Sequence, residues 1–211
     1  MKYWTFFSEQ ARKPTGIFGR FYMSRVFEKG NAELNALMFE TVPMEENDHV
    51  LEIGCGTGML IKHIADNLSQ GLIEGIDFSK QMVAMARKKN KKHLNSGQVK
   101  IHLGDFEQAE FEANSFDKIY TAHTIYFWKK PGDTIAKIHR ILRPGGRLVI
   151  GFRDKSEMEK MPLNKDIFKY YSAQDLKELL VNHGALAEID IVFKKSDQIT
   201  NYCAVCMKSK T

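Results

Sequence analysis

The sequence predicts an α/β fold in which a mostly parallel β-sheet carries helices on both faces. Short apolar runs typical of buried strands alternate with stretches in which apolar residues recur at helical spacing. Strands separated by helices form right-handed crossovers, which make neighbouring strands parallel. A chain of 211 residues is long enough for one such domain and short for two.

Seven apolar runs are expected to form the strands. They cover residues 49–53, 72–76, 99–103, 116–121, 147–152, about 186–193 and about 202–207. The Pro144-Gly145-Gly146 sequence before the fifth run is typical of a turn. The connection 194–199 between the last two runs is too short for a parallel crossover, so it predicts a hairpin.

Capping residues predict where three of the helices begin. Asn31 is expected to cap a helix before the first strand, and Ser79 is expected to cap the helix after the second. Ser172 and Asp175 have the spacing of a capping box, and they open a helix that ends near Gly184.

The charge of the chain does not indicate a nucleic-acid partner. The formal net charge is +5 and the isoelectric point is about 9.0, a modest excess for this length. Much of the excess lies in residues 87–92, where a helix is expected to end and where cations suit the negative end of its dipole. Because that helix leads away from the carboxyl ends of the strands, its basic end is expected to lie far from a ligand site. We therefore expect no nucleic-acid partner.

The three cysteines, Cys55, Cys203 and Cys206, predict neither a disulfide framework nor a metal site. Cys203 and Cys206 are three residues apart in an apolar run, so as strand residues they point to opposite faces, which disfavours zinc binding. The N-terminus lacks the pattern of a signal peptide, and no apolar run has membrane-spanning length. These features predict a reducing, cytoplasmic setting without a membrane span.

The strongest functional indication is a glycine-rich turn after the first strand. Gly54, Gly56 and Gly58 follow the apolar run directly. Glycines there permit positive φ angles and let a ligand approach the backbone at the start of a helix. The turn does not fit a dinucleotide fingerprint, which needs a third glycine where the chain has Met59. It also lacks the Gly-Lys-Ser/Thr of a phosphate-binding loop.

With Glu52 before it, this turn reads E-x-G-x-G-x-G and resembles the first motif of class I S-adenosylmethionine-dependent methyltransferases. Further segments follow in the order of that family. They are Gly75-Ile76-Asp77-Phe78-Ser79, Gly104-Asp105-Phe106, Ser115-Phe116-Asp117-Lys118-Ile119-Tyr120-Thr121-Ala122-His123 and Leu142-Arg143-Pro144-Gly145-Gly146. The resemblance covers about residues 48–152 and is closest to the small-molecule group that includes ubiquinone and menaquinone methyltransferases.

The resemblance implies a Rossmann-like sheet of seven strands, in which the last strand is antiparallel and inserts between its neighbours. It also implies S-adenosylmethionine as the cofactor, with Asp77 on the ribose hydroxyls and Asp105 on the adenine amino group. A capping role at the next helix is the alternative for Asp77. The residues expected to contact the cofactor are Glu52, Gly54, Cys55, Gly56, Gly58, Asp77, Phe78, Met82, Asp105, Phe106 and Thr121, and no metal ion is expected.

We expect a single methyltransferase domain over residues 1–211. Its parts are an N-terminal cap segment rich in aromatic residues (1–30), a cofactor-binding core (31–152), an insert or lid (153–171) and a C-terminal helix and strand pair (172–211). In the family that the chain resembles, the N-terminal segment often covers the cofactor and shapes the acceptor pocket.

His123 is the candidate catalytic residue. Methyl transfer from a sulfonium is an in-line displacement, and positioning alone can contribute about 7–11 kcal/mol to it. A base is needed only when the acceptor must lose a proton. His123 and Tyr126 follow the fourth strand, where the family holds the methionine part of the cofactor, so they are expected to face the methyl group. A packed loop histidine is the alternative for His123.

Methyl transfer to a small-molecule acceptor is the expected function. The basic charge leaves open an RNA, DNA or protein methyltransferase, although the region after the fourth strand lacks the Asp/Asn-Pro-Pro-Tyr/Phe motif that holds a flipped base. A non-catalytic S-adenosylmethionine-binding protein is a third alternative, because the glycines and Asp77 indicate binding rather than turnover. Met59 disfavours a nicotinamide dehydrogenase. The acceptor and the oligomeric state are not determined by the sequence.

Overall fold

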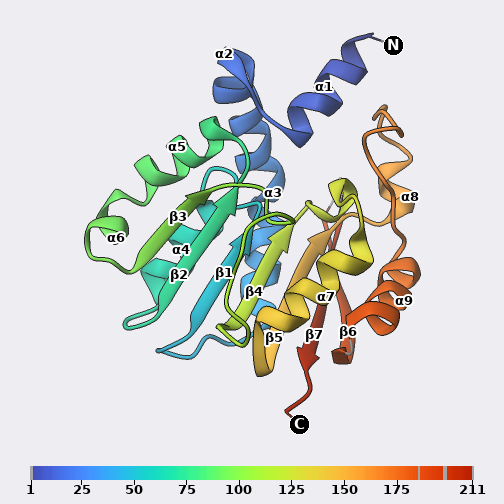
Figure 1. Ribbon diagram of the computed structural model, residues 1–211. Helices are drawn as coiled ribbons and strands as arrows, with labels where there is room; N and C mark the ends of the chain where they lie inside the picture. The colour runs from blue at the N-terminus through green and yellow to red at the C-terminus, as the bar shows by residue number, and fades with distance from the viewer. Residues whose placement is uncertain (1, 185, 197–198, 211) are drawn as a thin grey trace.

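The computed structural model describes residues 2–184, 186–196 and 199–210, and it contains a seven-stranded sheet in the order β3-β2-β1-β4-β5-β7-β6 (Figure 1). The strands are β1 (His49–Ile53), β2 (Leu72–Asp77), β3 (Val99–Leu103), β4 (Phe116–Ala122), β5 (Leu142–Phe152), β6 (Leu186–Lys195) and β7 (Thr200–Lys208). β1 to β5 pair in parallel, whereas β7 is antiparallel to both of its neighbours, β5 and β6. The predicted fold and the predicted β6–β7 hairpin are therefore confirmed. Residues 197–198 of the hairpin connection lie outside the described residues.

Helices cover both faces of this sheet (Figure 1). α3 (Ser24–Thr41), α4 (Met59–Asn67) and α5 (Lys80–Lys89) pack on one face, and α7 (Pro131–Ile141) and α9 (Ala173–Gly184) pack on the other. The remaining helices are α1 (Lys2–Arg12), α2 (Gly16–Phe18), the π-helical turn η1 (Gly19–Met23), α6 (Lys91–Asn95), the 3₁₀ turn η2 (Ile125–Phe127) and α8 (Lys155–Met158). Within the described ranges, no helix is long and apolar enough to cross a membrane.

Neighbouring strand residues alternate between two apolar cores, one on each face of the sheet. Val149 and Cys203 belong to the core beneath α3, α4 and α5, whereas Leu148 and Cys206 belong to the core beneath α7 and α9. Strands that are buried on both faces read as continuous apolar runs in the sequence. The arrangement confirms that Cys203 and Cys206 point to opposite faces.

Two of the predicted helix starts are confirmed. Ser79 Oγ accepts a hydrogen bond from the Met82 N–H at 3.4 Å, which caps α5. Ser172 and Asp175 form a capping box at α9: the Ser172 N–H donates to the Asp175 carboxylate at 2.9 Å, and the Asp175 N–H donates to Ser172 Oγ at 3.1 Å. α9 ends at Gly184, as predicted.

The predicted helix start at Asn31 is wrong, because α3 begins at Ser24 and continues through Gly30 and Asn31 without a break. Glycine and asparagine are poor helix formers, so their pair resembles a helix boundary in the sequence. Leu34 and Met38 are fully buried against the sheet and stabilise the helix just beyond this pair. Tertiary packing therefore outweighs a local preference of about 1 kcal/mol for the glycine.

The predicted turn at Pro144-Gly145-Gly146 lies within the irregular start of β5. Gly145 has a φ angle of +78°, and the register between β4 and β5 shifts at this point. Regular pairing with β4 resumes at Arg147, which is the first residue of the strand predicted from the sequence.

Glu74 of β2 lies between two histidines on the neighbouring strands. Its Oε1 is 2.9 Å from His49 Nε2 of β1, and its Oε2 is 2.6 Å from His102 Nε2 of β3. These hydrogen bonds, with the one from His49 as the larger cause, lower the pKa of Glu74 to about 2. The carboxylate therefore connects three adjacent strands through their side chains.

Glu74→Gln is expected to reduce the stability of the fold more near neutral pH than in acid. Because the folded-state pKa of Glu74 lies below its usual value of 4.5, the carboxylate stabilises the fold above about pH 4.5 and loses this effect as the pH falls to about 2. With solvent screening, the contribution is on the order of 1–2 kcal/mol. Urea unfolding of both proteins near neutral pH and near pH 3 measures it. An equal difference in unfolding free energy at both pH values would contradict this role.

Candidate active site

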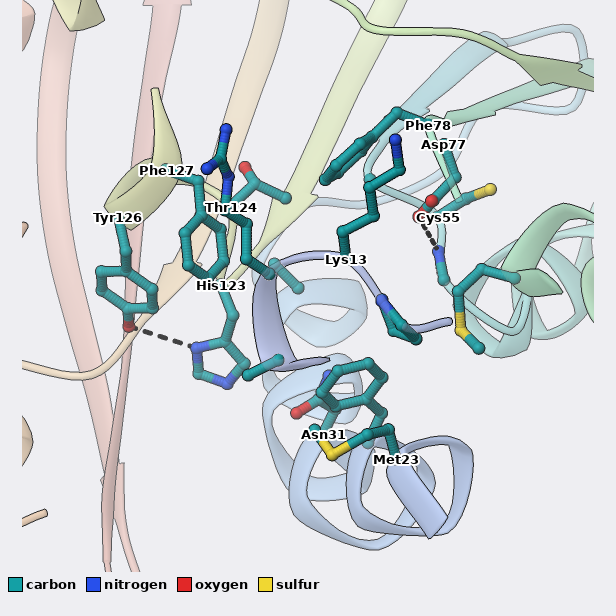
Figure 2. A pocket seen from close by; sticks show the side chains of 18 of the residues that line it. Lys13, Met23, Asn31, Cys55, Asp77, Phe78, His123, Thr124, Tyr126 and Phe127 are labelled. Carbon is teal, nitrogen blue, oxygen red and sulfur yellow. Dashed lines mark hydrogen bonds between the residues drawn. The ribbon is translucent and has the colours of Figure 1, made fainter. Parts of the chain in front are cut away.

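A cavity of about 870 Å³ lies at the carboxyl ends of β1, β2 and β4. Open α/β sheets bind their ligands at this edge. One wall consists of the strand ends and the loops that follow them, and the other consists of α1, residues 13–15 and α3. Figure 2 shows Lys13, Asp77 and Phe78 on one side of the cavity and His123 with Tyr126 on the other. The volume lies near the top of the range of about 300–1,000 Å³ for small-molecule sites.

The glycine-rich turn between β1 and α4 forms part of this wall. Gly54, Gly56 and Gly58 have φ angles of +70°, +51° and +74°, which side chains disfavour. At two of these positions a Cβ also has no room: it would lie 2.4 Å from Thr124 Cγ2 at Gly54 and 2.6 Å from Asn90 Nδ2 at Gly58. At Gly56, by contrast, no atom of a described residue lies within 4 Å of such a Cβ. Because Gly56 lines the cavity, its open side fits a ligand that approaches the backbone closely.

Asp77, at the end of β2, holds this turn in place. Its Oδ2 accepts a hydrogen bond from the Gly56 N–H at 3.0 Å, and its Oδ1 accepts one from the Ser79 N–H at 2.8 Å. Burial raises the pKa of Asp77 above its usual value, and the two hydrogen bonds oppose this effect. The side chain that caps α5 is Ser79, not Asp77. Each oxygen of the carboxylate retains a lone pair for a ligand in the cavity that Asp77 lines.

Glu52, at the end of β1, and Cys55, within the turn, are buried ionisable groups. Burial raises the pKa of both groups well above their usual values, and the charge of Asp77 adds to the shift. Glu52 accepts a hydrogen bond from the backbone N–H of Ile61 in the first turn of α4. Its Oε2, however, has no hydrogen-bond partner among the described residues. A buried, unpaired carboxylate oxygen at a cavity fits a hydrogen-bond donor on a ligand.

The β2–β3 side of the cavity is mostly apolar. It is lined by Phe78, Met82, Asp105 and Phe106. Lys13, from the loop after α1, places its Nζ 5.4 Å from the centre of the Phe78 ring (Figure 2). The next residue, Pro14, accepts a hydrogen bond through its carbonyl oxygen from Ser79 Oγ at 2.8 Å. These contacts hold the N-terminal segment over the end of β2.

His123 follows β4 in the left-handed backbone region, with a φ angle of +56°. Its backbone N–H donates to the Gly151 carbonyl at 2.9 Å, and its Nδ1 lies 3.2 Å from the Tyr126 hydroxyl (Figure 2). The Nε2 atom is buried without a partner among the described residues. Burial, and to a smaller extent the charge of Arg153, lower the pKa of His123 to about 3. The imidazole is therefore neutral near pH 7.

Tyr126 connects the loop after β4 to the end of β5. Its hydroxyl oxygen accepts a hydrogen bond from the backbone N–H of Arg153 at 2.6 Å. Burial raises the pKa of Tyr126, so the side chain remains a neutral hydroxyl. The Arg153 side chain itself lines the cavity with Tyr126 and His123. An imidazole (His123), a phenol (Tyr126) and a guanidinium (Arg153) thus line the same side of the cavity.

The structure brings most of the predicted site residues to one cavity. The residues that line it are Glu52, Gly54, Cys55, Gly56, Asp77, Phe78, Met82, Asp105, Phe106 and His123. Gly58 and Thr121 lie behind the wall, where Gly58 precedes α4 and Thr121 Oγ1 donates to the Ile53 carbonyl at 3.1 Å. The sequence did not indicate Lys13 or Arg153, although Arg153 directly follows a predicted strand. Within the described ranges, no group of three or more His, Cys, Asp or Glu side chains could hold a metal ion.

Residues 51–150 match a family described as a methyltransferase domain. The protein named "Putative methyltransferase YrhH" of Bacillus subtilis (strain 168) is 31% identical over 140 residues, and the match covers 66% of this chain and 76% of YrhH. Several other curated relatives are longer, and the chain spans 34–52% of their length. The sequence similarity therefore extends through the strands and turns that surround the cavity.

Solved methyltransferase structures have a similar fold. A chain from the "complex between the Haloferax volcanii Trm112 methyltransferase activator and the putative methyltransferase" has a TM-score of 0.75 at 20% identity, with coverage of 91% of this chain and 96% of that chain. Phosphoethanolamine N-methyltransferase 2 of Haemonchus contortus, in complex with phosphomonomethylethanolamine and S-adenosylhomocysteine, has a TM-score of 0.73 at 17% identity, with coverage of 92% and 58%. Because the chain matches the methyltransferase domain and carries the glycine-rich turn, it belongs to the class I methyltransferases, and its cofactor is S-adenosylmethionine.

Proposed function

We propose that the chain transfers the methyl group of S-adenosylmethionine to a small-molecule acceptor. The observation that carries this proposal is a cavity shared by two sets of residues. Asp77 and the glycine-rich turn line one part of it, and His123, Tyr126 and Arg153 line another. Because α1 and α3 border the same cavity, an acceptor would lie between these helices and the sheet edge. This arrangement suits a small molecule better than an RNA or a folded protein.

The residues around the glycine-rich turn fit the cofactor. The open space over Gly56 accommodates a ligand against the backbone, and the unpaired Glu52 Oε2 suits a donor on the methionine part. Asp77 would accept hydrogen bonds from the ribose hydroxyls, and Asp105 would accept one from the adenine amino group. Cys55 would contact the cofactor from within the turn, and the apolar wall for the adenine ring would be formed by Phe78, Met82 and Phe106.

The acceptor side would act mainly by positioning. The cofactor supplies a methyl group on a sulfonium, and holding an acceptor in line with it can contribute about 7–11 kcal/mol. For a hydroxyl acceptor, His123 would take up the proton on Nε2, the buried atom that has no partner among the described residues. In the tautomer in which Nδ1–H donates to the Tyr126 oxygen, Nε2 carries the free lone pair. Tyr126 would then act by orienting the imidazole.

The flanking segments also support this proposal. Residues 1–30 and 153–171 would cover the acceptor, since both segments contribute side chains to the cavity wall. We propose that they form one domain with the core. A reducing, cytoplasmic setting would suit the three buried, free cysteines of the described chain.

The basic run 87–92 bears on the nucleic-acid alternative. α5 leads away from the edge where the strands end (Figure 1). The exposed lysines of the run are Lys88 in α5 and Lys91 and Lys92 in α6. Lys89 differs from them, because it pairs with Glu28 of α3, and Glu28 lines the cavity. Lys89 therefore has a charge partner within the fold, and it is left out of the test below.

Reversing the charge of the three exposed lysines, as Lys88→Glu, Lys91→Glu and Lys92→Glu together, is expected to leave methyl transfer nearly unchanged. A surface that neutralised about three phosphates would show a log–log salt dependence with a slope near −2.7 on duplex DNA. We expect no such binding by the wild-type protein at physiological ionic strength. Salt titration of DNA and RNA binding, together with turnover of the triple variant, measures both. Loss of activity in the triple variant would favour a nucleic-acid substrate.

The proposed function is tested by following isotopically labelled methyl from S-adenosylmethionine into a host extract. We expect a labelled product of low molecular mass that fails to form with the Gly56→Val variant, whose side chain would fill the ligand side of the turn. Label in RNA, DNA or protein would contradict the small-molecule acceptor. Cofactor binding without any labelled product would support a non-catalytic binding protein instead.

A further inference from the structure

Arg153 occupies a distinct position along the edge of the sheet. The strand order β2-β1-β4-β5 places Asp77, the glycine-rich turn, His123 and Arg153 in succession, because each of them ends or follows one of these strands. Arg153 therefore lies one strand beyond His123, on the side opposite to Asp77. If the ribose binds at Asp77 and the methyl group lies near His123, as proposed above, the position of Arg153 would face the acceptor.

Within the described part of the chain, the guanidinium of Arg153 has no anionic partner. Among the described residues, no carboxylate lies within 4.0 Å of it, and its buried Nε has no hydrogen-bond partner. Nη1 contacts the Met161 sulfur at 3.8 Å, and sulfur is a weak acceptor. The nearby Glu157 instead pairs with Lys160 at 3.0 Å. Burial lowers the pKa of Arg153, which reflects the cost of a desolvated charge.

The cavity that Arg153 lines has polar groups from α3, namely Glu28, Asn31 and Asn35, but its lining from η2 and from the segment after Arg153 is largely apolar. That apolar lining consists of Phe127, Met158, Met161, Leu163, Ile167 and Phe168. The backbone of Arg153 is fixed by its hydrogen bond to the Tyr126 hydroxyl, and a Cβ at Gly30 of α3 would lie 3.8 Å from Nη2. The guanidinium is thus held between the end of β5 and α3, at one end of this apolar lining.

From these contacts we infer that the acceptor is an amphipathic small molecule whose anionic oxygen group, a carboxylate or a phosphate, pairs with Arg153. The inference rests on the proposed function and names the acceptor class for the same cavity. A guanidinium presents two parallel N–H donors that match either anion. The anion would supply the counter-charge that the fold lacks, and the apolar lining would hold the rest of the molecule. Arg153 is then the residue that determines acceptor specificity.

A matched series of ligands tests this inference without requiring turnover. Octanoate, octyl phosphate, octanol and octylamine share one apolar chain and differ in the head group. Their affinities are measured by calorimetry on protein saturated with S-adenosylhomocysteine. We expect at least one of the two anions to bind about 10- to 100-fold more tightly than octanol, the range for hydrogen bonds to a charged group. The tighter anion distinguishes a carboxylate from a phosphate acceptor.

Arg153→Met is expected to remove this preference, and Arg153→Lys is expected to retain part of it through the charge alone. The matched control is Lys155→Met, which removes an exposed positive charge two residues away and should leave the preference unchanged. The affinity of Arg153→Met for S-adenosylhomocysteine should stay near that of the wild-type protein. If Arg153→Met does not fold, the Arg153→Lys comparison still provides the test.

Three results would overturn the inference. The first is equal binding, or no binding, of the four compounds by the wild-type protein. The second is an anion preference that survives in Arg153→Met or that disappears equally in Lys155→Met. The third is a parallel loss of S-adenosylhomocysteine affinity in Arg153→Met, which would assign the guanidinium to the cofactor's own carboxylate. Failure of the wild-type protein to transfer methyl groups would contradict the proposed function instead, because the binding comparison does not depend on turnover.

Discussion

His123→Asn is expected to lower kcat for a hydroxyl acceptor by about 10²–10⁴-fold while cofactor affinity stays nearly unchanged. The expected loss is that of a general base that accepts a proton in the transition state. Asparagine is the suitable replacement because the backbone of His123 has a φ angle of +56°, which asparagine tolerates better than alanine. It also keeps a polar group that can reach the Tyr126 hydroxyl. Single-turnover kinetics with the true acceptor, together with calorimetry of S-adenosylhomocysteine, separates the two effects.

The pH profile supplies a second readout for His123. Because burial and Arg153 lower its pKa to about 3, the imidazole is in its basic form at every pH well above that value. In the free enzyme, His123 should therefore produce no limb in kcat/KM between about pH 5 and pH 8. An anionic acceptor beside Arg153 would offset one cause of this shift and raise the pKa of His123 in the complex. Removal of the imidazole without any change in turnover would leave positioning as the mechanism.

Tyr126→Phe is the matched control for this prediction. It removes the hydroxyl that hydrogen-bonds to both His123 Nδ1 and the Arg153 N–H, but it leaves Nε2 in place. If Tyr126 only orients the base, the Tyr126→Phe variant should lose less activity than the His123→Asn variant. Equal losses in both variants would instead indicate that the loop after β4 must keep its shape and that His123 acts only as a packed side chain.

The central sheet could be predicted because each of its strands and turns is recognisable from a short stretch of the sequence. Each strand is a short apolar run, and the turn from Gly54 to Gly58 requires positive φ angles that glycine allows. The α3 boundary could not be predicted, because Gly30 and Asn31 disfavour a helix locally while buried Leu34 stabilises it from the sheet. The spacing of apolar residues in the sequence shows which face of a helix is buried, but it does not give the free energy that this burial contributes.

The candidate site also has a part that could be predicted from the sequence and a part that could not. The cofactor side could be predicted, because its residues lie in short sequence motifs at fixed positions after the strands, as Asp77 does after β2. The acceptor side depends on contacts between distant segments. Arg153 was identified as a site residue because its backbone binds the Tyr126 hydroxyl, because its side chain lies near α3, and because no carboxylate of the described chain pairs with it. Lys13 reaches Phe78 only through the path of the N-terminal segment. None of these contacts leaves a pattern along the sequence.

Asp77→Ala is expected to weaken binding of S-adenosylmethionine and S-adenosylhomocysteine by about 1.5–3 kcal/mol, the scale of hydrogen bonds to a charged group. Two effects contribute, because the carboxylate would bind the ribose and also accepts the Gly56 N–H at 3.0 Å, which orders the turn. Asp77→Asn should recover part of the loss, since the amide retains one acceptor oxygen. Calorimetry on the folded variants measures these affinities.

Ser79→Ala separates ribose binding from helix capping. It removes the side chain that caps α5 and that donates to the Pro14 carbonyl, but it leaves the Asp77 carboxylate intact. If Asp77 binds the ribose, Ser79→Ala should keep most of the cofactor affinity that Asp77→Ala loses. The carboxylate form should also be required, so affinity should fall as the pH approaches the raised pKa of Asp77 from above. Wild-type affinity in both Asp77 variants would contradict ribose binding by Asp77, because a carboxylate that binds the ribose cannot be removed without weakening the complex.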